Sequence, residues 1–311
     1  MREGGGAAML TGDQVRTVRQ HLGPVGVWLT ASGPVTIDDE RAAARRIEEF
    51  GYGSLWSGEV IGGREAFAYK AVLLAATDRL VAGTGIANVW ARQPATMQGG
   101  AATLGAAYPG RFVLGVGVSH APIVEHSGQK YEKPLAHMAH YLDGMDAAVA
   151  GTPATGRPVP RVLAALRPRM LELARDRADG AHPYFVPALH SARAREALGP
   201  DKLLIPERAV VLQTDAAEAR RIAREHMERY LQLPNYVNNL RHLGYGDDDI
   251  ADGGSDRLVD AIVAWGDEED IARRVREHLA GGADHVLLQP LGALPQALGQ
   301  LEALAPALLV R

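Results

Sequence analysis

Short apolar runs alternate along the chain with longer stretches in which apolar residues recur every three or four positions. The short runs predict strands at residues 25–30, 54–57, 80–87, 112–116, 159–164, 184–186, 209–213 and 285–289. The longer stretches predict helices at residues 37–50, 66–77, 93–107, 137–150, 169–178, 191–198, 216–230 and 268–280. Gly51 and Gly281 directly follow two of these helices and are expected to cap them. Such regular alternation predicts a parallel sheet covered by helices.

The number of strand and helix units favours one fold within the α/β class. Eight units in a chain of this length predict a (β/α)8 TIM barrel rather than an open doubly wound sheet. Residues 231–266 are too long for a loop and carry a second helical pattern, so we expect an insertion before the last β/α unit. Residues 1–10 are expected to be a flexible N-terminal tail, and residues 11–311 a single TIM-barrel domain.

Composition excludes several classes of function. The chain contains no cysteine, which removes disulfides, thiolate catalysis and cysteine-ligated metals. A net charge of −4 argues against a nucleic-acid partner. No run approaches the about 20 apolar residues of a membrane span, and the N-terminus lacks the apolar core of a signal peptide. We therefore expect a cytoplasmic protein with no membrane association.

The stretch GRFVLGVGVSHAP, residues 110–122, has glycines after an apolar run and raises the possibility of a phosphate site. A dinucleotide-binding turn needs a third small residue where His120 stands, followed at once by a helix. Pro122 follows instead, so this interpretation fails. The backbone of GVGVS can still bind an anion, with Ser119 as an extra donor. The alternative is that the glycines only allow close packing of the strand.

Three further features each allow a functional and a structural interpretation. Glu59 follows the second predicted strand, where it could transfer a proton or form a surface salt bridge with Arg64. The glycines of GTGIAN, residues 83–88, could mark either a ligand site or a tight packing site. A helix start near Pro168 could attract an anion together with Arg167. The histidines lack a matched set of further ligands, so we predict no metal site.

Several of these segments together resemble one known family. The stretch GTGIANVWARQPATMQGGAATLGAAYPGRFVLGVGVSH, with ALRPRMLELARDRADGAHPYFV and ADHVLLQP, is similar to the luciferase-like monooxygenase superfamily. The closer likeness is to its oxidoreductases that use the deazaflavin coenzyme F420. The resemblance implies a TIM-type barrel with a late insertion and a cofactor at the carboxyl ends of the strands. It also implies a homodimer.

The resemblance also implies which residues hold the cofactor. A non-prolyl cis peptide at the end of the third strand would back the ring, at Gly85–Ile86 or at Ile86–Ala87, and Asn88 would contact the ring edge. The matching positions for the cofactor tail and its phosphate are Gly117, Val118, Ser119, Ala165, Leu166 and Arg167. Relatives often carry histidine or an aspartate–histidine pair after the second strand, where this chain has Gly58 and Glu59. The absence of a basic side chain at Val118 and Ser119 favours F420 over the alternative, FMN.

We therefore predict an F420-dependent oxidoreductase that transfers a hydride between the deazaflavin and a small-molecule substrate. Glu59 or His120 is the expected proton donor. One alternative is an FMN-dependent monooxygenase of the same fold that uses reduced flavin and oxygen. Another is a protein that binds F420 or flavin without catalysis.

Overall fold

The computed structural model describes residues 9–29 and 35–309, so most of the predicted tail and the last residue of the strand predicted at 25–30 lie outside the described residues. Its strands all pair in parallel within one curved sheet. They are β1 (Val25–Trp28), β2 (Ser54–Ser57), β3 (Val81–Thr84), β4 (Ala87–Asn88), β5 (Phe112–Gly117), β6 (Arg161–Leu163), β7 (Gly180–Ala181), β8 (Leu203–Leu204), β9 (Glu207–Leu212), β10 (Val263–Gly266) and β11 (Val286–Pro290).

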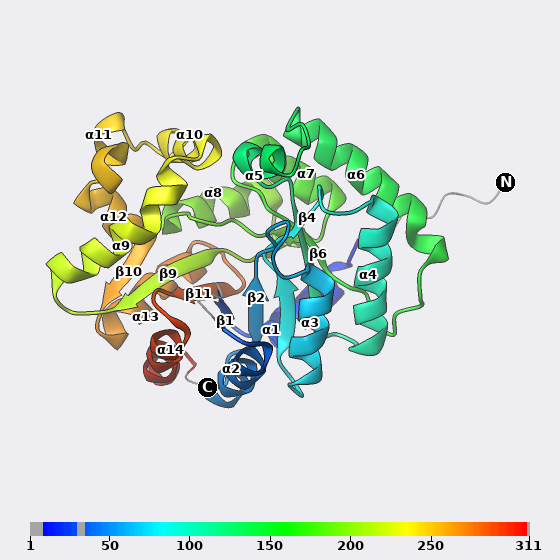
Figure 1. Cartoon of the computed structure of the whole chain (residues 1–311), viewed down its shortest axis with the longest axis horizontal. Coiled ribbons are helices and arrows are strands. Elements are labelled where there is room, and N and C mark those ends of the chain that lie inside the picture. Colours follow the sequence, from blue (N-terminus) through cyan, green and yellow to red (C-terminus); the bar gives the residue numbers. More distant parts are fainter. Residues whose placement is uncertain (1–8, 30–34, 310–311) are drawn as a thin grey trace.

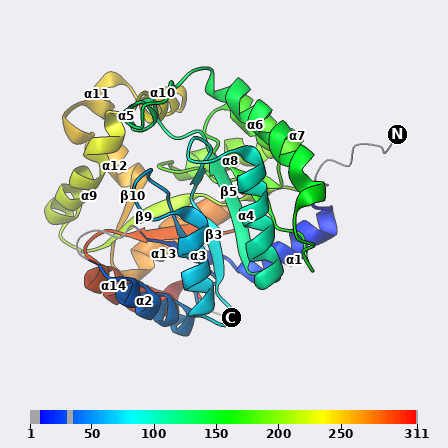
Figure 2. The ribbon, with the colours of Figure 1, turned by 45° about the vertical axis from the view of Figure 1, so that its right-hand side comes forward.

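Helices surround this sheet, and α10 lies beside the short helix α5 in both ribbon views (Figures 1 and 2). The helices are α1 (Gly12–Leu22), α2 (Ile37–Phe50), α3 (Ala66–Ala75), α4 (Pro94–Ala107), α5 (Ala121–His126), α6 (Pro134–Ala148), α7 (Pro168–Arg177), α8 (Ala188–Leu198), α9 (Ala216–Leu231), α10 (Pro234–His242), α11 (Asp247–Ile250), α12 (Asp256–Ile262), α13 (Glu268–Ala280) and α14 (Leu294–Leu308). Two short 3-10 turns are η1 (Val149–Gly151) and η2 (Ala251–Gly253).

The sheet curls into a TIM-barrel-like arrangement, which confirms the predicted fold class. Its strands follow the order β9, β11, β1, β2, β3, β5, β6, β7, β8. The two ends of this order meet because β8 and β9 are separated only by Ile205 and Pro206. On one side Ile205 N donates to Ala181 O, and on the other Leu287 N donates to Pro206 O, each at 2.9 Å. Strand β10 pairs with β9 outside this ring.

The prediction of a strand at residues 184–186 is wrong. The sixth strand of the barrel is β7, a few residues earlier, and Phe185 has a φ of 57°, which no strand accommodates. Residues 184–186 are apolar because Phe185 packs against Tyr230 and Tyr236, with ring centroids 4.9 and 5.3 Å apart. Burial against helices, rather than strand pairing, explains the apolar pattern there.

Other boundaries differ from the prediction in smaller ways. The predicted strand at 80–87 is split into β3 and β4 at Gly85 and Ile86. The segment 231–266 contains α10, α11 and α12 as expected, but its last residues form β10. The sequence interpretation missed α1, which precedes the first strand and so falls outside the alternation, and α14, which follows β11 as the alternation requires.

The interior of the barrel is filled by large side chains from the strands. Trp56 is fully buried there, and a Cβ atom on Gly83 would lie 2.2 Å from its ring. Glycine at position 83 is therefore a packing requirement for this tryptophan. Val15 and Leu22 of α1 belong to the same apolar cluster, so α1 covers the end of the barrel at which the strands begin.

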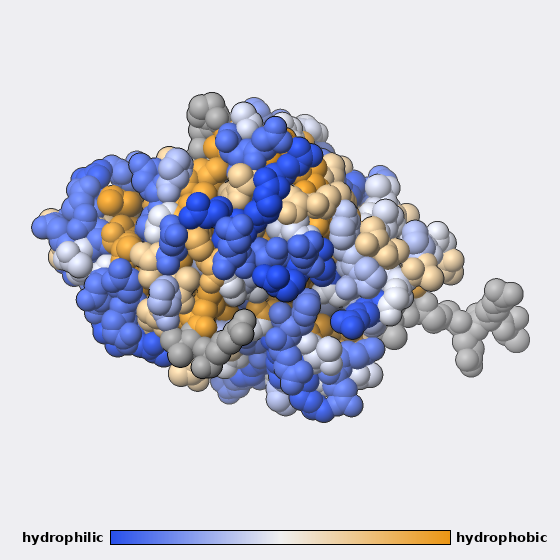
Figure 3. Space-filling model, turned by 90° about the horizontal axis from the view of Figure 1, so that it is seen from below, coloured by the Kyte–Doolittle hydropathy of each residue, from blue (hydrophilic) through white to orange (hydrophobic). Residues whose placement is uncertain are grey.

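The outer surface carries both hydrophilic and hydrophobic residues. Seen from below in Figure 3, hydrophilic residues surround a band of hydrophobic ones. No helix in the described ranges has the length and apolar character needed to cross a membrane.

Glu207 is an acidic side chain enclosed by the fold. It is 2% exposed on β9, and its Oε2 accepts a hydrogen bond from Phe185 N at 3.1 Å. Its Oε1 has no hydrogen-bond partner among the described residues. Burial raises the pKa of this carboxyl to about 7, although the Phe185 N–H opposes the shift.

We expect the Glu207→Gln variant to unfold less readily than the wild type at about pH 8, with little difference at about pH 5. A raised pKa in the folded state means that stability is lost as the pH rises from the ordinary value toward 7. The gain at the higher pH should be on the order of 2 kcal/mol, measured by urea unfolding. Exposed Glu196→Gln is the control. A gain that is equal at both pH values would contradict the assignment.

Candidate functional site

One large cavity opens at the carboxyl ends of the strands, where a TIM barrel carries its active site. It has a volume of about 1040 Å³. Its walls come from the residues that follow β1, β2, β3, β5, β6 and β7, together with the end of α9 and α10. One part of the cavity therefore lies against the barrel, and another part lies against the segment inserted after α9.

The cavity floor is formed by backbone at the break between β3 and β4. The Gly85–Ile86 peptide bond is cis, which confirms the first of the two predicted positions. Trp28 Nε1 donates to Gly85 O at 3.2 Å. A Cβ atom on Gly85 would lie 2.6 Å from Trp28 Nε1 and 3.1 Å from His182 Nε2. Only glycine fits here, so the floor presents backbone instead of a side chain.

The structure brings most of the predicted site residues to this one cavity. Those that line it are Glu59, Gly85, Ile86, Val118, Ser119, His120, Ala165, Leu166 and Arg167. Three others lie behind the wall, because Ala87 pairs with Val116 and Asn88 with Gly117 in the sheet. A Cβ atom on Gly117 would lie 2.6 Å from Ile86 Cγ1, so this glycine serves close packing.

Asn88 was expected to contact the ring edge but is fully buried. Its Oδ1 accepts a hydrogen bond from Trp90 N at 3.0 Å, while its Nδ2 has no partner in the described chain. Asn88 therefore shapes the turn after β4 from behind the cavity wall.

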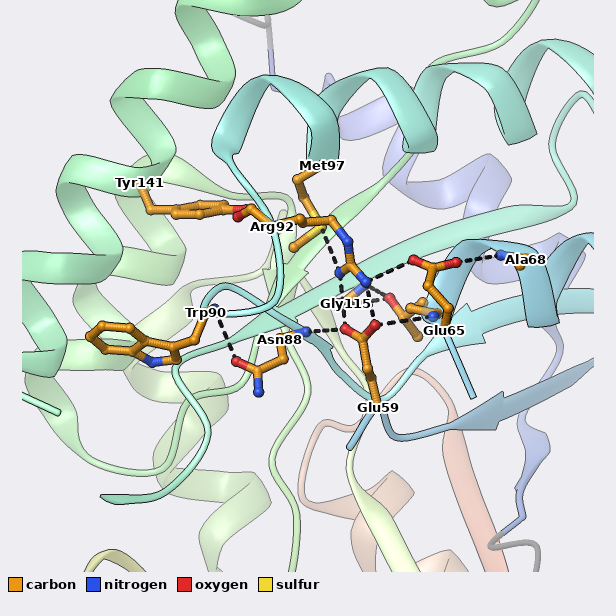
Figure 4. Close-up of polar contacts among 11 residues, drawn as sticks. Glu59, Glu65, Ala68, Asn88, Trp90, Arg92, Met97, Gly115 and Tyr141 are labelled. Atoms are coloured by element: carbon orange, nitrogen blue, oxygen red, sulfur yellow. Dashed lines mark hydrogen bonds and ion pairs between the residues drawn. The ribbon is translucent and has the colours of Figure 1, made fainter. Parts of the chain in front are cut away.

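Glu59 is held in a closed network of hydrogen bonds (Figure 4). Its Oε2 accepts from Asn88 N at 2.8 Å and from Arg92 Nη1 at 2.9 Å. Its Oε1 accepts from Ala66 N at 3.1 Å and also from Arg92 Nη2. The carboxylate side chain is only 4% exposed. A carboxylate with these donors ties the segment after β2 to the segment after the cis bond.

The salt bridge considered between Glu59 and Arg64 does not form. Arg64 Nε instead donates to Glu40 Oε2 at 2.8 Å. The true partner, Arg92, lies 33 residues from Glu59 in the sequence and follows a different strand. Sequence spacing favoured the nearer arginine, and only the barrel geometry selects the farther one.

His120 lies at the start of α5 and lines the cavity. Its Nδ1 is 2.9 Å from Asn235 Oδ1 on α10, so this ring nitrogen donates and Nε2 carries the lone pair in the neutral form. Burial lowers the pKa of His120, while the Asn235 contact opposes that shift. His120 is therefore mainly neutral at pH 7 and able to accept a proton at Nε2.

His182 lines the cavity, but the sequence interpretation missed it. It lies just before residues 184–186, which were predicted to form a strand. It is 2% exposed, and its Nδ1 donates to Ile205 O at 2.7 Å. Burial lowers its pKa to about 4, so it carries no charge at neutral pH. With Trp56 at a ring distance of 5.3 Å, His182 supports the floor from inside the barrel.

One end of the cavity is suited to bind an anion. Helix α7 begins at Pro168, and no side chain caps its first N–H groups. Arg167 and Arg169 beside this helix start line the cavity and are exposed, and neither has a carboxylate partner in the described chain. Ser119, with a φ of 57°, lines the same cavity. The helix start and the two guanidinium groups together attract negative charge.

We expect the Glu59→Gln variant to lose about 3 kcal/mol of unfolding free energy, because the buried Arg92 then keeps only the half-exposed Glu65 as a counter-ion. Glu65→Gln is the matched control, since Glu65 binds the same arginine but its side chain is 49% exposed. It should cost less than about 1 kcal/mol. In a double-mutant cycle by urea unfolding, Glu59→Gln and Arg92→Met together should cost clearly less than their sum. Additive costs would show that the pair is not coupled.

Comparison with known proteins agrees with this geometry. Residues 20–285 match the family model described as luciferase-like monooxygenase. The 5,10-methylenetetrahydromethanopterin reductase of Methanolobus tindarius is 23% identical over 291 residues, covering 80% of this chain and 89% of that protein.

Solved structures share the fold. An F420-dependent secondary alcohol dehydrogenase in complex with an F420–acetone adduct has a TM-score of 0.72 at 16% identity, over 92% of this chain and 99% of its own. The oxygenating constituent of 3,6-diketocamphane monooxygenase from Pseudomonas putida, in complex with FMN, has a TM-score of 0.67 at 14% identity, over 91% and 95% of the two chains. The family match covers most of this chain, and the protein belongs to the luciferase-like monooxygenase family.

Proposed function

We propose that the protein is an F420-dependent oxidoreductase that moves a hydride between the deazaflavin and a small organic substrate. One observation carries the proposal. A single cavity combines a backbone floor at the Gly85–Ile86 bond with an arginine-bearing helix start at Arg167. The backbone floor suits a flat ring, and the arginine-bearing helix start suits an anionic tail.

The residues present fit such a group. A floor without side chains allows a planar ring to lie against backbone, and the neutral His182 beneath it adds no charge. The cavity volume is at the upper end of the range for small-molecule sites, which leaves space for a cofactor and a substrate together. When bound, coenzyme F420 supplies a ring carbon that carries a hydride.

One feature supports F420 over FMN. Solved structures of similar fold include both an F420 protein and an FMN complex, so the fold is compatible with either. Arg167 and Arg169 both lack a carboxylate partner within residues 9–29 and 35–309, which suits a ligand with several negative groups. F420 carries a phosphodiester and carboxylates in its tail, whereas FMN carries one phosphate.

His120 is the proton-transfer group in this proposal. Its Nδ1 is fixed by Asn235, and its neutral Nε2 accepts the hydroxyl proton of an alcohol substrate or, once protonated, returns it to a carbonyl oxygen. Glu59, the other predicted donor, has both oxygens engaged by Arg92 and backbone N–H groups. Its role is therefore to position the segment after the cis bond.

Fluorescence titration should show tight, saturable binding of oxidised F420 and weaker binding of FMN. The Arg169→Ala variant should raise the Kd for F420 roughly tenfold, because a charge-assisted contact contributes on the order of 1.5 kcal/mol. Arg175→Ala on the same helix is the control, since its guanidinium binds Asp176. Tighter binding of FMN would contradict the proposal and assign the protein to the flavin-dependent, oxygen-using branch of the family.

The pH dependence of turnover should report His120. With F420 and a secondary alcohol that the protein oxidises as the test pair, kcat/KM should be constant at neutral pH and fall below pH 6.5, where the group with the lowered pKa becomes protonated. His120→Gln should remove this acidic limb and lower kcat/KM roughly 100-fold, with the Kd for F420 unchanged. An acidic limb that persists in the variant would exclude His120 as the base.

A further inference from the structure

A further positively charged side chain lines the cavity, away from α7. Arg229, on the last turn of α9, lines the cavity and is exposed there. Its guanidinium donates to Tyr230 Oη, and no carboxylate of the described chain lies within ion-pair distance. Among the described residues, Glu59 is the one that brings a carboxylate to the cavity, and it is bound to Arg92. An anionic partner for Arg229 within the cavity would therefore come from a ligand.

The tyrosines next to Arg229 leave its remaining donors free. Tyr184 Oη donates to Gln289 Oε1 at 2.6 Å and lies 2.7 Å from Tyr230 Oη. Because the single Tyr184 proton is used on Gln289, Tyr230 donates to Tyr184 and accepts from Arg229. The hydroxyls of Tyr230 and Tyr184 thus lie at one edge of the guanidinium, and its other N–H groups have no carboxylate acceptor in the described structure.

The cavity wall between Arg229 and the floor is aromatic. Ring centroids are 5.3 Å apart for Trp28 and Tyr184, 5.4 Å for Tyr184 and Tyr230, and 5.5 Å for Tyr230 and Tyr236. Trp28 at one end of this series donates to Gly85 O on the cavity floor. The wall therefore runs continuously from the Gly85–Ile86 floor to the arginine, and offers aromatic faces to an apolar ligand.

We propose that this wall is the substrate side of the cavity and that the substrate is an apolar, ring-containing molecule with a carboxylate, which Arg229 binds. The inference rests on the proposed function, since it assigns the floor to the cofactor ring and the α7 end to its tail. The aromatic wall holds the apolar body by stacking and burial. The guanidinium binds the carboxylate through charge-assisted hydrogen bonds, which orients the molecule relative to the floor.

Binding of two matched probes to the full-length protein tests the proposal. The probes are 3-phenylpropionate and its uncharged amide, titrated by calorimetry with and without saturating F420; acetate tests the carboxylate alone. We expect the acid to bind at least tenfold more tightly than the amide, and acetate to bind far more weakly. Arg229→Met should remove the difference between acid and amide, and Arg229→Lys should retain part of it, because lysine keeps the charge without the planar fork.

The control variant is Arg221→Met on the same helix, whose guanidinium binds Glu218 and Glu225. It should behave as the wild type with every probe. Equal binding of acid and amide to the wild type, or no binding of either, would overturn the proposal. So would an Arg229→Met variant that loses affinity for F420 as strongly as for the acid, since Arg229 would then hold the cofactor. Failure of the wild type to bind F420 would instead overturn the proposed function, while the comparison of acid with amide would still report on Arg229.

Discussion

The cavity floor depends on how the chain passes from β3 to β4, and the Glu59 carboxylate fixes that passage. Gly85 N donates to Ser57 O at 2.8 Å before the cis bond, and Glu59 N donates to Ile86 O at 3.1 Å after it. The Glu59 side chain then binds Asn88 N and Arg92. The cis segment is thus held at both ends, by Ser57 at the end of β2 and by Glu59 just after it. Neutralisation by Arg92 is what allows this carboxylate to remain buried there.

Charge around the cavity is distributed unevenly. Burial lowers the pKa of His182 to about 4 and also lowers that of His120, so at neutral pH these rings act as neutral hydrogen-bonding groups. Positive charge without a carboxylate partner in the described chain remains at Arg229 and at the arginines beside α7. Because arginine keeps its proton at any physiological pH, attraction of anionic ligands should vary little with pH, whereas proton transfer should vary.

The sequence allowed prediction of the parts of the fold that follow local periodicity, and of several residues after strand ends that line the cavity. The barrel class, the late insertion and the cis position at Gly85–Ile86 could be predicted, the last through the resemblance to the family. The strand at 184–186 could not be excluded, since an apolar triplet looks the same whether it pairs in a sheet or packs against helices. Contacts across the barrel, such as Glu59 with Arg92 and His120 with Asn235, have no local signal at all.

The two sides of the cavity come from different parts of the chain, and this has a consequence for specificity. The floor and the anionic end are built by the turns after β3, β5 and β6, whose backbone is fixed by strand pairing. The aromatic side takes Arg229, Tyr230 and Tyr236 from α9 and α10. Contact between the two sides includes the hydrogen bond from His120 to Asn235, which joins the proposed base to the proposed substrate wall. In the proposed function, side chains on α9 and α10 can therefore differ with the substrate so long as Asn235 continues to orient the histidine. The barrel turns must keep the geometry that the proposed cofactor requires.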